Sequence, residues 1–123
     1  MKLDLDALNT YLEKLHGDGG IVSMDTEADV LTLKFCGSVG GPYDEGEIEL
    51  AFFGVDMIHL PMSLILPAQL STADDPETES LLGANYRWKD RTLWVLTDNV
   101  GSRWHVYAAG YSVRVLPVFW QRP

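Results

Sequence analysis

The hydrophobic period of this 123-residue chain changes once, near residue 17, and that change constrains the fold more than any other feature. Within the first fifteen residues, Leu5, Leu8, Leu12 and Leu15 recur at the spacing of an amphipathic helix. Beyond residue 20, apolar and polar residues alternate with the period of two that half-buried strands show. One helix followed by strands with mostly short connections predicts an α+β domain, in which an N-terminal helix packs on a mainly antiparallel β-sheet. A small β-barrel with a helical lid is the alternative.

The two ends of the expected helix have recognisable signals. Asp4 or Asp6 can accept hydrogen bonds from the first backbone N–H groups of the helix. Asn9 and Glu13 fall away from the leucine stripe, so we expect their side chains to face solvent. Residues 17–20, Gly-Asp-Gly-Gly, predict a loop that leads from the helix into the sheet.

No repeat or linker divides the chain, so we expect a single domain over residues 1–123, with four to seven strands. The expected extended segments are residues 21–24, 30–35, 47–53, 55–60, 92–97, 103–108 and 111–116, with Pro117 ending the last one. The alternation predicts that Leu31, Leu33, Phe35, Ile48, Leu50 and Phe52 face the core. A short helix over residues 77–82, capped by Asp74 or Asp75, is also expected.

Residues 98–102, Asp-Asn-Val-Gly-Ser, predict a hairpin turn between two of the expected strands. The register of the hairpin follows from which residues face each other across this turn. If Thr97 faces Ser102, then Trp94 lies opposite His105 and shares one face of the hairpin with it.

Charge is divided along the chain. Residues 1–80 contain 16 acidic residues and three lysines, residues 81–123 contain six basic and two acidic residues, and the net charge is −9. A chain this acidic repels a polyanion, so we expect a cationic protein as the partner and no direct contact with nucleic acid. Two acidic groups are the candidate contacts: Asp44, Glu45, Glu47 and Glu49, and then Asp74, Asp75, Glu77 and Glu79.

Cysteine content and hydropathy indicate a soluble, cytoplasmic protein. Cys36 is the single cysteine, so no internal disulfide forms, as is typical of chains from a reducing compartment. The N-terminus lacks the basic start and long apolar run of a signal peptide. The most apolar stretch, residues 51–70, is interrupted by Asp56, Pro61 and Pro67, so we expect no membrane span.

Side chains that carry out catalysis in other proteins are present, but they form no motif. Cys36 ends an expected strand with no base nearby, so we expect a small buried side chain rather than a nucleophile. His16, His59 and His105 share no metal-ligand spacing, so we expect no metal or other cofactor. The sequence therefore favours a protein that is not an enzyme. An active site assembled from His59, Asp56 and His105 is the alternative.

Two further alternatives depend on apolar and aromatic side chains. A pocket for a small molecule or peptide would be lined by Trp88, Trp94, His105 and Tyr107. A homodimer would form through residues 55–67, with Met57, Met62, Leu64 and Leu66 as contacts, or through Phe119 and Trp120.

The interpretation that accounts for most of these features is a small acidic protein-binding module. It would act as an inhibitor or immunity-type protein whose acidic face covers a basic site on its partner. In size and composition the chain resembles the small bacterial immunity proteins that neutralise toxins by binding them. The resemblance implies a binding function and includes no motif, so no residue role follows from it.

Overall fold

The computed structural model describes residues 4–38, 44–83 and 91–119, which form two helices and two open antiparallel sheets. The helices are α1 (Leu5–Lys14) and α2 (Asp75–Leu82). The strands are β1 (His16–Asp25), β2 (Val30–Ser38), β3 (Asp44–Phe53), β4 (Met57–His59), β5 (Leu64–Ile65), β6 (Gln69–Thr72), β7 (Thr92–Thr97), β8 (Arg103–Ala108) and β9 (Gly110–Phe119). The predicted α+β fold is confirmed. The barrel alternative is wrong because both sheets are open.

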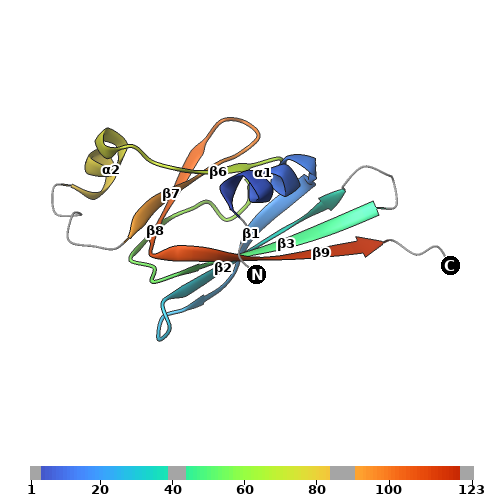
Figure 1. Ribbon diagram of the computed structural model, residues 1–123, viewed down its shortest axis with the longest axis horizontal. Helices are drawn as coiled ribbons and strands as arrows, with labels where there is room; N and C mark the ends of the chain where they lie inside the picture. The colour runs from blue at the N-terminus through green and yellow to red at the C-terminus, as the bar shows by residue number, and fades with distance from the viewer. Residues whose placement is uncertain (1–3, 39–43, 84–90, 120–123) are drawn as a thin grey trace.

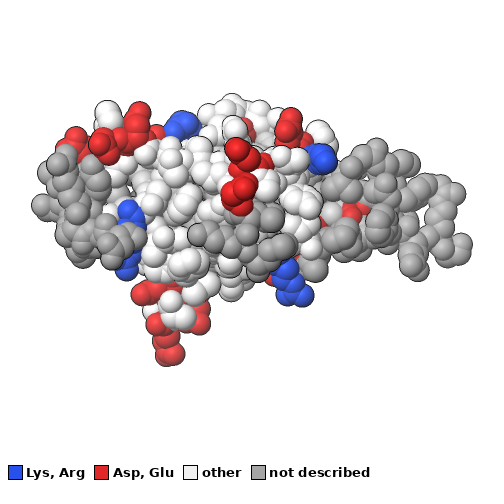
Figure 2. All heavy atoms as spheres, in the orientation of Figure 1, with Lys and Arg blue, Asp and Glu red and all other residues white. Residues whose placement is uncertain are grey.

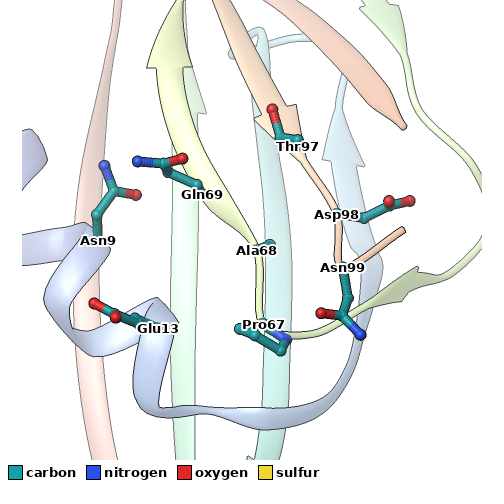
Figure 3. A pocket seen from close by; sticks show the side chains of 8 residues that line it. All are labelled: Asn9, Glu13, Pro67, Ala68, Gln69, Thr97, Asp98 and Asn99. Carbon is teal, nitrogen blue, oxygen red and sulfur yellow. The ribbon is translucent and has the colours of Figure 1, made fainter. Parts of the chain in front are cut away.

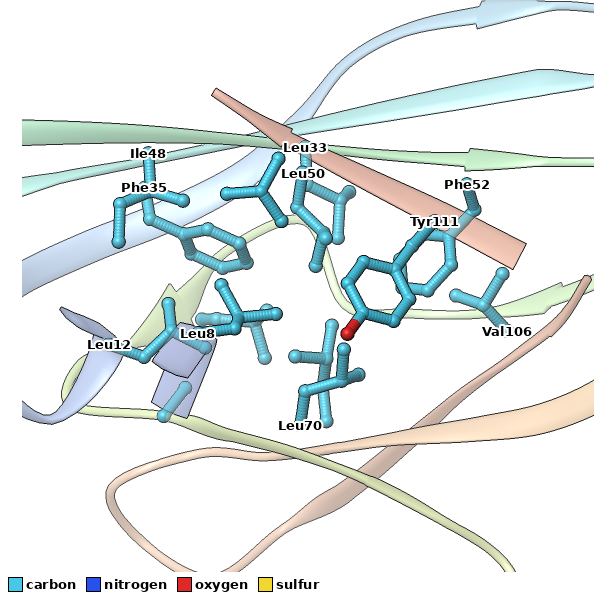
Figure 4. Packing of buried hydrophobic residues seen from close by; sticks show 14 of the residues in the cluster. Leu8, Leu12, Leu33, Phe35, Ile48, Leu50, Phe52, Leu70, Val106 and Tyr111 are labelled. Atoms are coloured by element: carbon cyan, nitrogen blue, oxygen red, sulfur yellow. The ribbon is translucent and has the colours of Figure 1, made fainter. Parts of the chain in front are cut away.

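The strands divide into a five-stranded sheet of order β5-β1-β2-β3-β9 and a four-stranded sheet of order β4-β8-β7-β6 (Figure 1). The core lies between the five-stranded sheet on one side and α1 with the four-stranded sheet on the other. Figure 4 shows Leu8 and Leu12 of α1, and Leu70 and Val106 of the four-stranded sheet, below the side chains of β2 and β3.

The inner face of the five-stranded sheet follows the alternation in the sequence. The six residues predicted to face the core are all at most 2% exposed: Leu31, Leu33, Phe35, Ile48, Leu50 and Phe52. This prediction is confirmed. The other face of the same strands is therefore the outer face of the sheet.

The N-terminal helix begins as expected, but one of its side chains has an unexpected partner. Asp4 caps α1, since its Oδ1 accepts a hydrogen bond from the backbone N–H of Ala7 (2.8 Å). Asn9, predicted to face solvent, instead reaches the backbone of β6. Its Nδ2 donates to the carbonyl oxygen of Leu70 (2.8 Å), and the Leu70 N–H donates to its Oδ1 (2.7 Å). The Asn9 amide thus joins α1 to β6.

Residues 17–20 were predicted to form a loop, and that prediction is wrong, because they belong to β1. Gly17 pairs with Gly37 across the β1–β2 ladder, and Gly19 pairs with Phe35. A Cβ atom at Gly17 would lie 2.1 Å from the carbonyl oxygen of Cys36, and one at Gly19 would lie 2.1 Å from Cδ1 of Phe35. These glycines permit a close approach to β2 rather than a turn.

Strands β7 and β8 have the predicted bounds, but the predicted register is wrong by one residue. Thr97 pairs with Arg103 rather than with Ser102. Ser102 belongs to the turn, because its carbonyl oxygen accepts from the N–H of Asp98 (3.0 Å) and its own N–H donates to the Asp98 carboxylate (3.0 Å). Each cross-strand pair of the hairpin is shifted accordingly.

Strands β5 and β6 were not predicted, and the other elements differ from the prediction mainly at their ends. Strand β9 continues past Pro117 to Phe119, which an edge strand tolerates. Helix α2 is present and starts two residues earlier than predicted, with Asp74 as its N-cap. Neither α1 nor α2 is long and apolar enough to cross a membrane, within the part of the chain that the structure describes.

Candidate functional site

The outer face of the five-stranded sheet carries the first predicted acidic group. Ile48 and Leu50 point to the core. Because side chains alternate along a strand, Glu45, Glu47 and Glu49 point outward. We call this surface the outer sheet face. Its polar residues with described side chains include Asp18 of β1, Thr32, Lys34 and Cys36 of β2, Glu45, Glu47 and Glu49 of β3, and Ser112 and Arg114 of β9. The side chain of Asp44 lies outside the described residues.

Two of the acidic residues on the outer sheet face are paired with bases on neighbouring strands. Lys34 Nζ lies 3.2 Å from Glu47 Oε1, and Arg114 Nη1 lies 3.7 Å from Glu49 Oε2. The hydrogen bond to Glu47 raises the pKa of Lys34 above its usual value. Glu45 is exposed near the start of β3. The face therefore holds charged side chains in ion pairs that link β3 to β2 and to β9.

Cys36 was predicted to be a buried side chain, and that prediction is wrong. It is exposed on the outer sheet face, since it follows the buried Phe35 and the alternation turns it outward. Its Sγ donates a weak hydrogen bond to Glu47 Oε1 (3.7 Å). Partial burial and the nearby Glu47 carboxylate raise the pKa of the thiol, which disfavours the reactive thiolate.

The outer sheet face contains two shallow cavities. One, of about 390 Å³, lies over β3 and β9 and is bordered by Thr32, Glu49 and Arg114. The other, of about 320 Å³, lies over β1 and β2 and is bordered by Lys34 and Cys36. Both cavities thus place polar and charged side chains around a concave surface.

The second predicted acidic group lies on and before α2, and its members include the cap of this helix and a residue bonded to β8. Asp74 caps α2 by accepting from the backbone N–H of Glu77 (2.9 Å). The Glu77 carboxylate accepts two hydrogen bonds from Arg103 of β8, from Nη2 (2.6 Å) and from Nε (3.0 Å). This two-point contact fixes α2 against β8. Asp75 is exposed.

Glu77 also belongs to a chain of hydrogen bonds with two histidines. Its Oε2 lies 2.9 Å from Nε2 of His105, and Nδ1 of His105 lies 3.3 Å from Nδ1 of His59 on β4. The enzyme alternative grouped His59 with His105, and the structure places them side by side. Asp56 is directed elsewhere, with its Oδ2 3.8 Å from Nε of Arg91. The carboxylate beside His105 is that of Glu77, which the enzyme alternative did not include.

The paired state of Glu77 makes stability depend on pH. Arg103, and after it His105, hold the pKa of Glu77 at about 2, below its ordinary value of 4.5. A carboxyl group whose pKa is lower in the folded state stabilises the fold above its ordinary pKa, and this contribution is lost as the pH falls from about 5 to about 2. Over this range we expect the wild type to lose about 1 to 2 kcal/mol more free energy of unfolding than Glu77→Gln does. Denaturant titrations at a series of pH values measure this difference.

Asp75→Asn is the matched control for that experiment, since Asp75 is an exposed carboxylate on the same helix. We expect its pH profile to follow that of the wild type. A Glu77→Gln profile parallel to the wild type would show that the Arg103 contact contributes nothing to stability.

Among the described residues of the predicted aromatic pocket, Trp94 lies on a different face of the hairpin from His105 and Tyr107. The corrected register places Trp94 opposite Val106, and it places His105 opposite Val95 on the other face. Trp94 packs in the core, edge-on to Tyr111, with its Nε1 donating to the carbonyl oxygen of Ala108 (3.2 Å). Tyr107 is buried on the same face as His105. Trp88 lies outside the described residues.

The predicted apolar contact segment is only partly accessible. Leu64 and Leu66 are buried members of the core, so their assignment as contacts for a second chain is wrong. Met57 is half-buried, whereas Met62 is 97% exposed beside the cavity over β1 and β2. The side chains of Phe119 and Trp120 lie outside the described residues.

A further cavity of about 390 Å³ lies between α1, the start of β6 and the β7–β8 turn (Figure 3). Asn9, Glu13 and Gln69 line one side, and Thr97 and Asn99 line the other. The Asn9 side chain is held by its two bonds to Leu70, so part of this lining has a structural role. Sequence reasoning missed this cavity because its walls come from three separate elements.

Acidic side chains outnumber basic ones on the face of the molecule shown in Figure 2. The turn between β1 and β2, which carries Asp25, Glu27 and Asp29, projects from the body of the molecule in Figure 1. Within the described ranges, no group of three or more His, Cys, Asp or Glu side chains is placed to hold a metal ion. Comparison with protein-family models, with curated proteins and with solved structures finds no match to this chain.

Proposed function

We propose that the chain acts by binding rather than by catalysis, as a module that contacts a cationic protein through the outer sheet face. The observation that carries the proposal is the charge of this face. Four acidic residues, Asp18, Glu45, Glu47 and Glu49, stand against Lys34 and Arg114 in its described part. The chain as a whole has a net charge of −9. Complementary charge accelerates encounter with a basic partner and disfavours acidic ones.

The ion pairs on this face favour its use as a binding surface. An exposed pair of this kind contributes only about 0 to 1 kcal/mol to stability. A basic side chain of a partner can therefore replace Lys34 beside Glu47, or Arg114 beside Glu49, at little cost to the fold. The shallow cavities beside these pairs give an incoming side chain room to enter.

The inhibitor or immunity type is the more specific form of this proposal. Its support is the small size and acidic composition of the chain, which would allow it to cover a basic active site. The single cysteine fits a partner that is met in the reducing cytoplasm.

A charge-reversal pair tests the proposed surface. Glu45→Lys changes the outer sheet face, and Glu27→Lys makes the same change of net charge in the exposed β1–β2 turn. Each variant and the wild type are immobilised, exposed to lysate of the native organism at stepped salt, and the retained proteins are identified by mass spectrometry. The captured protein is then purified and titrated against all three chains by calorimetry.

We expect Glu45→Lys to weaken binding of the purified partner about tenfold or more, and Glu27→Lys to leave it nearly unchanged. We also expect the affinity of the wild type to fall as salt rises. Equal losses in both variants would indicate attraction by net charge alone. Binding that is unaffected by Glu45→Lys would contradict the assignment of the outer sheet face.

A further inference from the structure

The contact between His59 and His105 has a geometry that, when both rings are neutral, only one arrangement of hydrogens satisfies. The two residues are cross-strand partners on β4 and β8, and their Nδ1 atoms are 3.3 Å apart. The ring centroids are 5.5 Å apart and the ring planes differ by 15°. Each Nδ1 therefore points nearly along the line between the rings. A hydrogen bond on this line needs a hydrogen on one Nδ1 and a lone pair on the other.

The contact that Nε2 of His105 makes determines which ring donates the hydrogen bond between the two Nδ1 atoms. Nε2 of His105 faces Oε2 of Glu77 (2.9 Å), and the Glu77 carboxylate is also bound by Arg103. An ionised carboxylate only accepts hydrogen bonds, so Nε2 of His105 carries a hydrogen. When both rings are neutral, Nδ1 of His105 is then the acceptor, and Nδ1–H of His59 is the donor.

This chain of hydrogen bonds accommodates one added proton but not two. If the pair gains one proton, one ring carries hydrogen on both nitrogens and still donates to the free Nδ1 of the other. If it gains two, both Nδ1 atoms carry hydrogen and face each other at 3.3 Å, which abolishes the hydrogen bond and opposes two positive charges. The contact as it stands is therefore compatible with one added proton, and a second one requires the two Nδ1 atoms to separate.

We propose that the His59–His105 pair is a pH-sensitive contact that holds β4 on the four-stranded sheet and releases it when both rings are protonated. The proton reaches the pair from solvent through His59, which is exposed, whereas the His105 side chain is only 9% exposed. Strand β4 has three residues and lies at the edge of its sheet, so few other contacts hold it. Its departure uncovers the backbone edge of β8, which can then pair with another strand.

The charged groups around the two histidines do not offset the positive charge that a second proton adds. Helix α2 contributes Glu77, and β8 contributes Arg103, which already neutralises that carboxylate. Trp104 of β8 lies against His59, with ring centroids 5.4 Å apart, and favours one positive charge there. Strand β7 contributes Val95, the partner of His105, which is apolar. One carboxylate thus faces three cations when both histidines are charged.

Amide hydrogen exchange followed by NMR between about pH 8 and pH 5, the range in which histidines titrate, tests the proposal. The reporter is the N–H of Asp56, which donates to the carbonyl oxygen of Tyr107 (2.8 Å) beside β4. After correction for the intrinsic pH dependence of exchange, we expect its protection to fall about tenfold towards pH 5. Protection of Leu50 in the core strand β3 should not change. Glu77 remains ionised over this range, since its pKa is about 2.

Two substitutions make the result specific. In His59→Gln the second charge cannot form, so the pH dependence of Asp56 protection should disappear. His16→Gln is the matched control, since His16 is an exposed histidine at the start of β1, in the other sheet, and it should behave as the wild type does. The proposal is overturned if protection at Asp56 is independent of pH in the wild type. It is equally overturned if His59→Gln shows the same fall, or if Leu50 loses protection in parallel.

Discussion

Phe52→Ala is expected to lower the free energy of unfolding by about 3 to 5 kcal/mol. Phe52 is fully buried on the inner face of β3, and its ring lies 6.4 Å from that of Trp94, centroid to centroid. Truncation removes the aromatic ring from a close-packed interior and leaves a cavity between the two sheets. Denaturant-induced unfolding, followed by tryptophan fluorescence and by circular dichroism, measures the loss.

Phe53→Ala is the matched control for Phe52→Ala, because it makes the same chemical change at the next residue of the same strand. Phe53 points outward and is 44% exposed. We expect Phe53→Ala to cost less than half as much as Phe52→Ala, since much of its ring is already in water. Equal losses from the two substitutions would contradict the assignment of the inner and outer faces of β3.

Asn9→Ala is expected to cost about 2 to 4 kcal/mol, which is large for a polar residue near a surface. The substitution removes both hydrogen bonds to Leu70, so the backbone N–H and carbonyl of that residue lose their side-chain partner beside α1. A buried donor or acceptor that is left without a partner costs about 1 to 3 kcal/mol. The free energy of unfolding and the exchange rate of the Leu70 amide are the quantities to measure.

Asn9→Asp and Thr10→Ala separate the causes of that loss. Asn9→Asp keeps an acceptor for the Leu70 N–H but faces the Leu70 carbonyl with a carboxylate, so we expect at least as great a loss. Thr10 Oγ1 donates only to the carbonyl oxygen of Asp6 within α1 and is exposed, so Thr10→Ala should cost less than about 0.5 kcal/mol. A small effect of Asn9→Ala would show that water replaces the amide.

The features predicted correctly from the sequence depend on neighbours along the chain. The alternation in β2 and β3 needs only the pleat of a strand, so the buried faces of Leu33 and Leu50 follow from local spacing. The N-caps Asp4 and Asp74 were likewise each narrowed to one of two aspartates from residues within one helical turn. Local patterns are therefore sufficient to predict the fold class and the inward residues of these strands.

The features that were missed depend on pairing between distant segments. His59 and His105 are 46 residues apart in the chain, and Glu77 and His105 are 28 apart, so no local pattern relates them. The register error had a different cause, because the five-residue turn closed by Asp98 and Ser102 is compatible with two alignments of β7 and β8 until its hydrogen bonds are known. That single shift places Trp94 and His105 on opposite faces of the hairpin, whereas the prediction put them on the same face.

The pairing of β3 with β9 has a consequence for the order of assembly during synthesis. Asp44 pairs with Phe119 at one end of this ladder, and Phe53 pairs with Gly110 at the other. As the chain leaves the ribosome, β1, β2 and β3 emerge early and form neighbouring hairpins, whereas the far edge of β3 stays unpaired until β9 has been made and has emerged. A nascent chain stopped before that point therefore presents an unpaired strand edge, which makes it prone to aggregation and a substrate for chaperones.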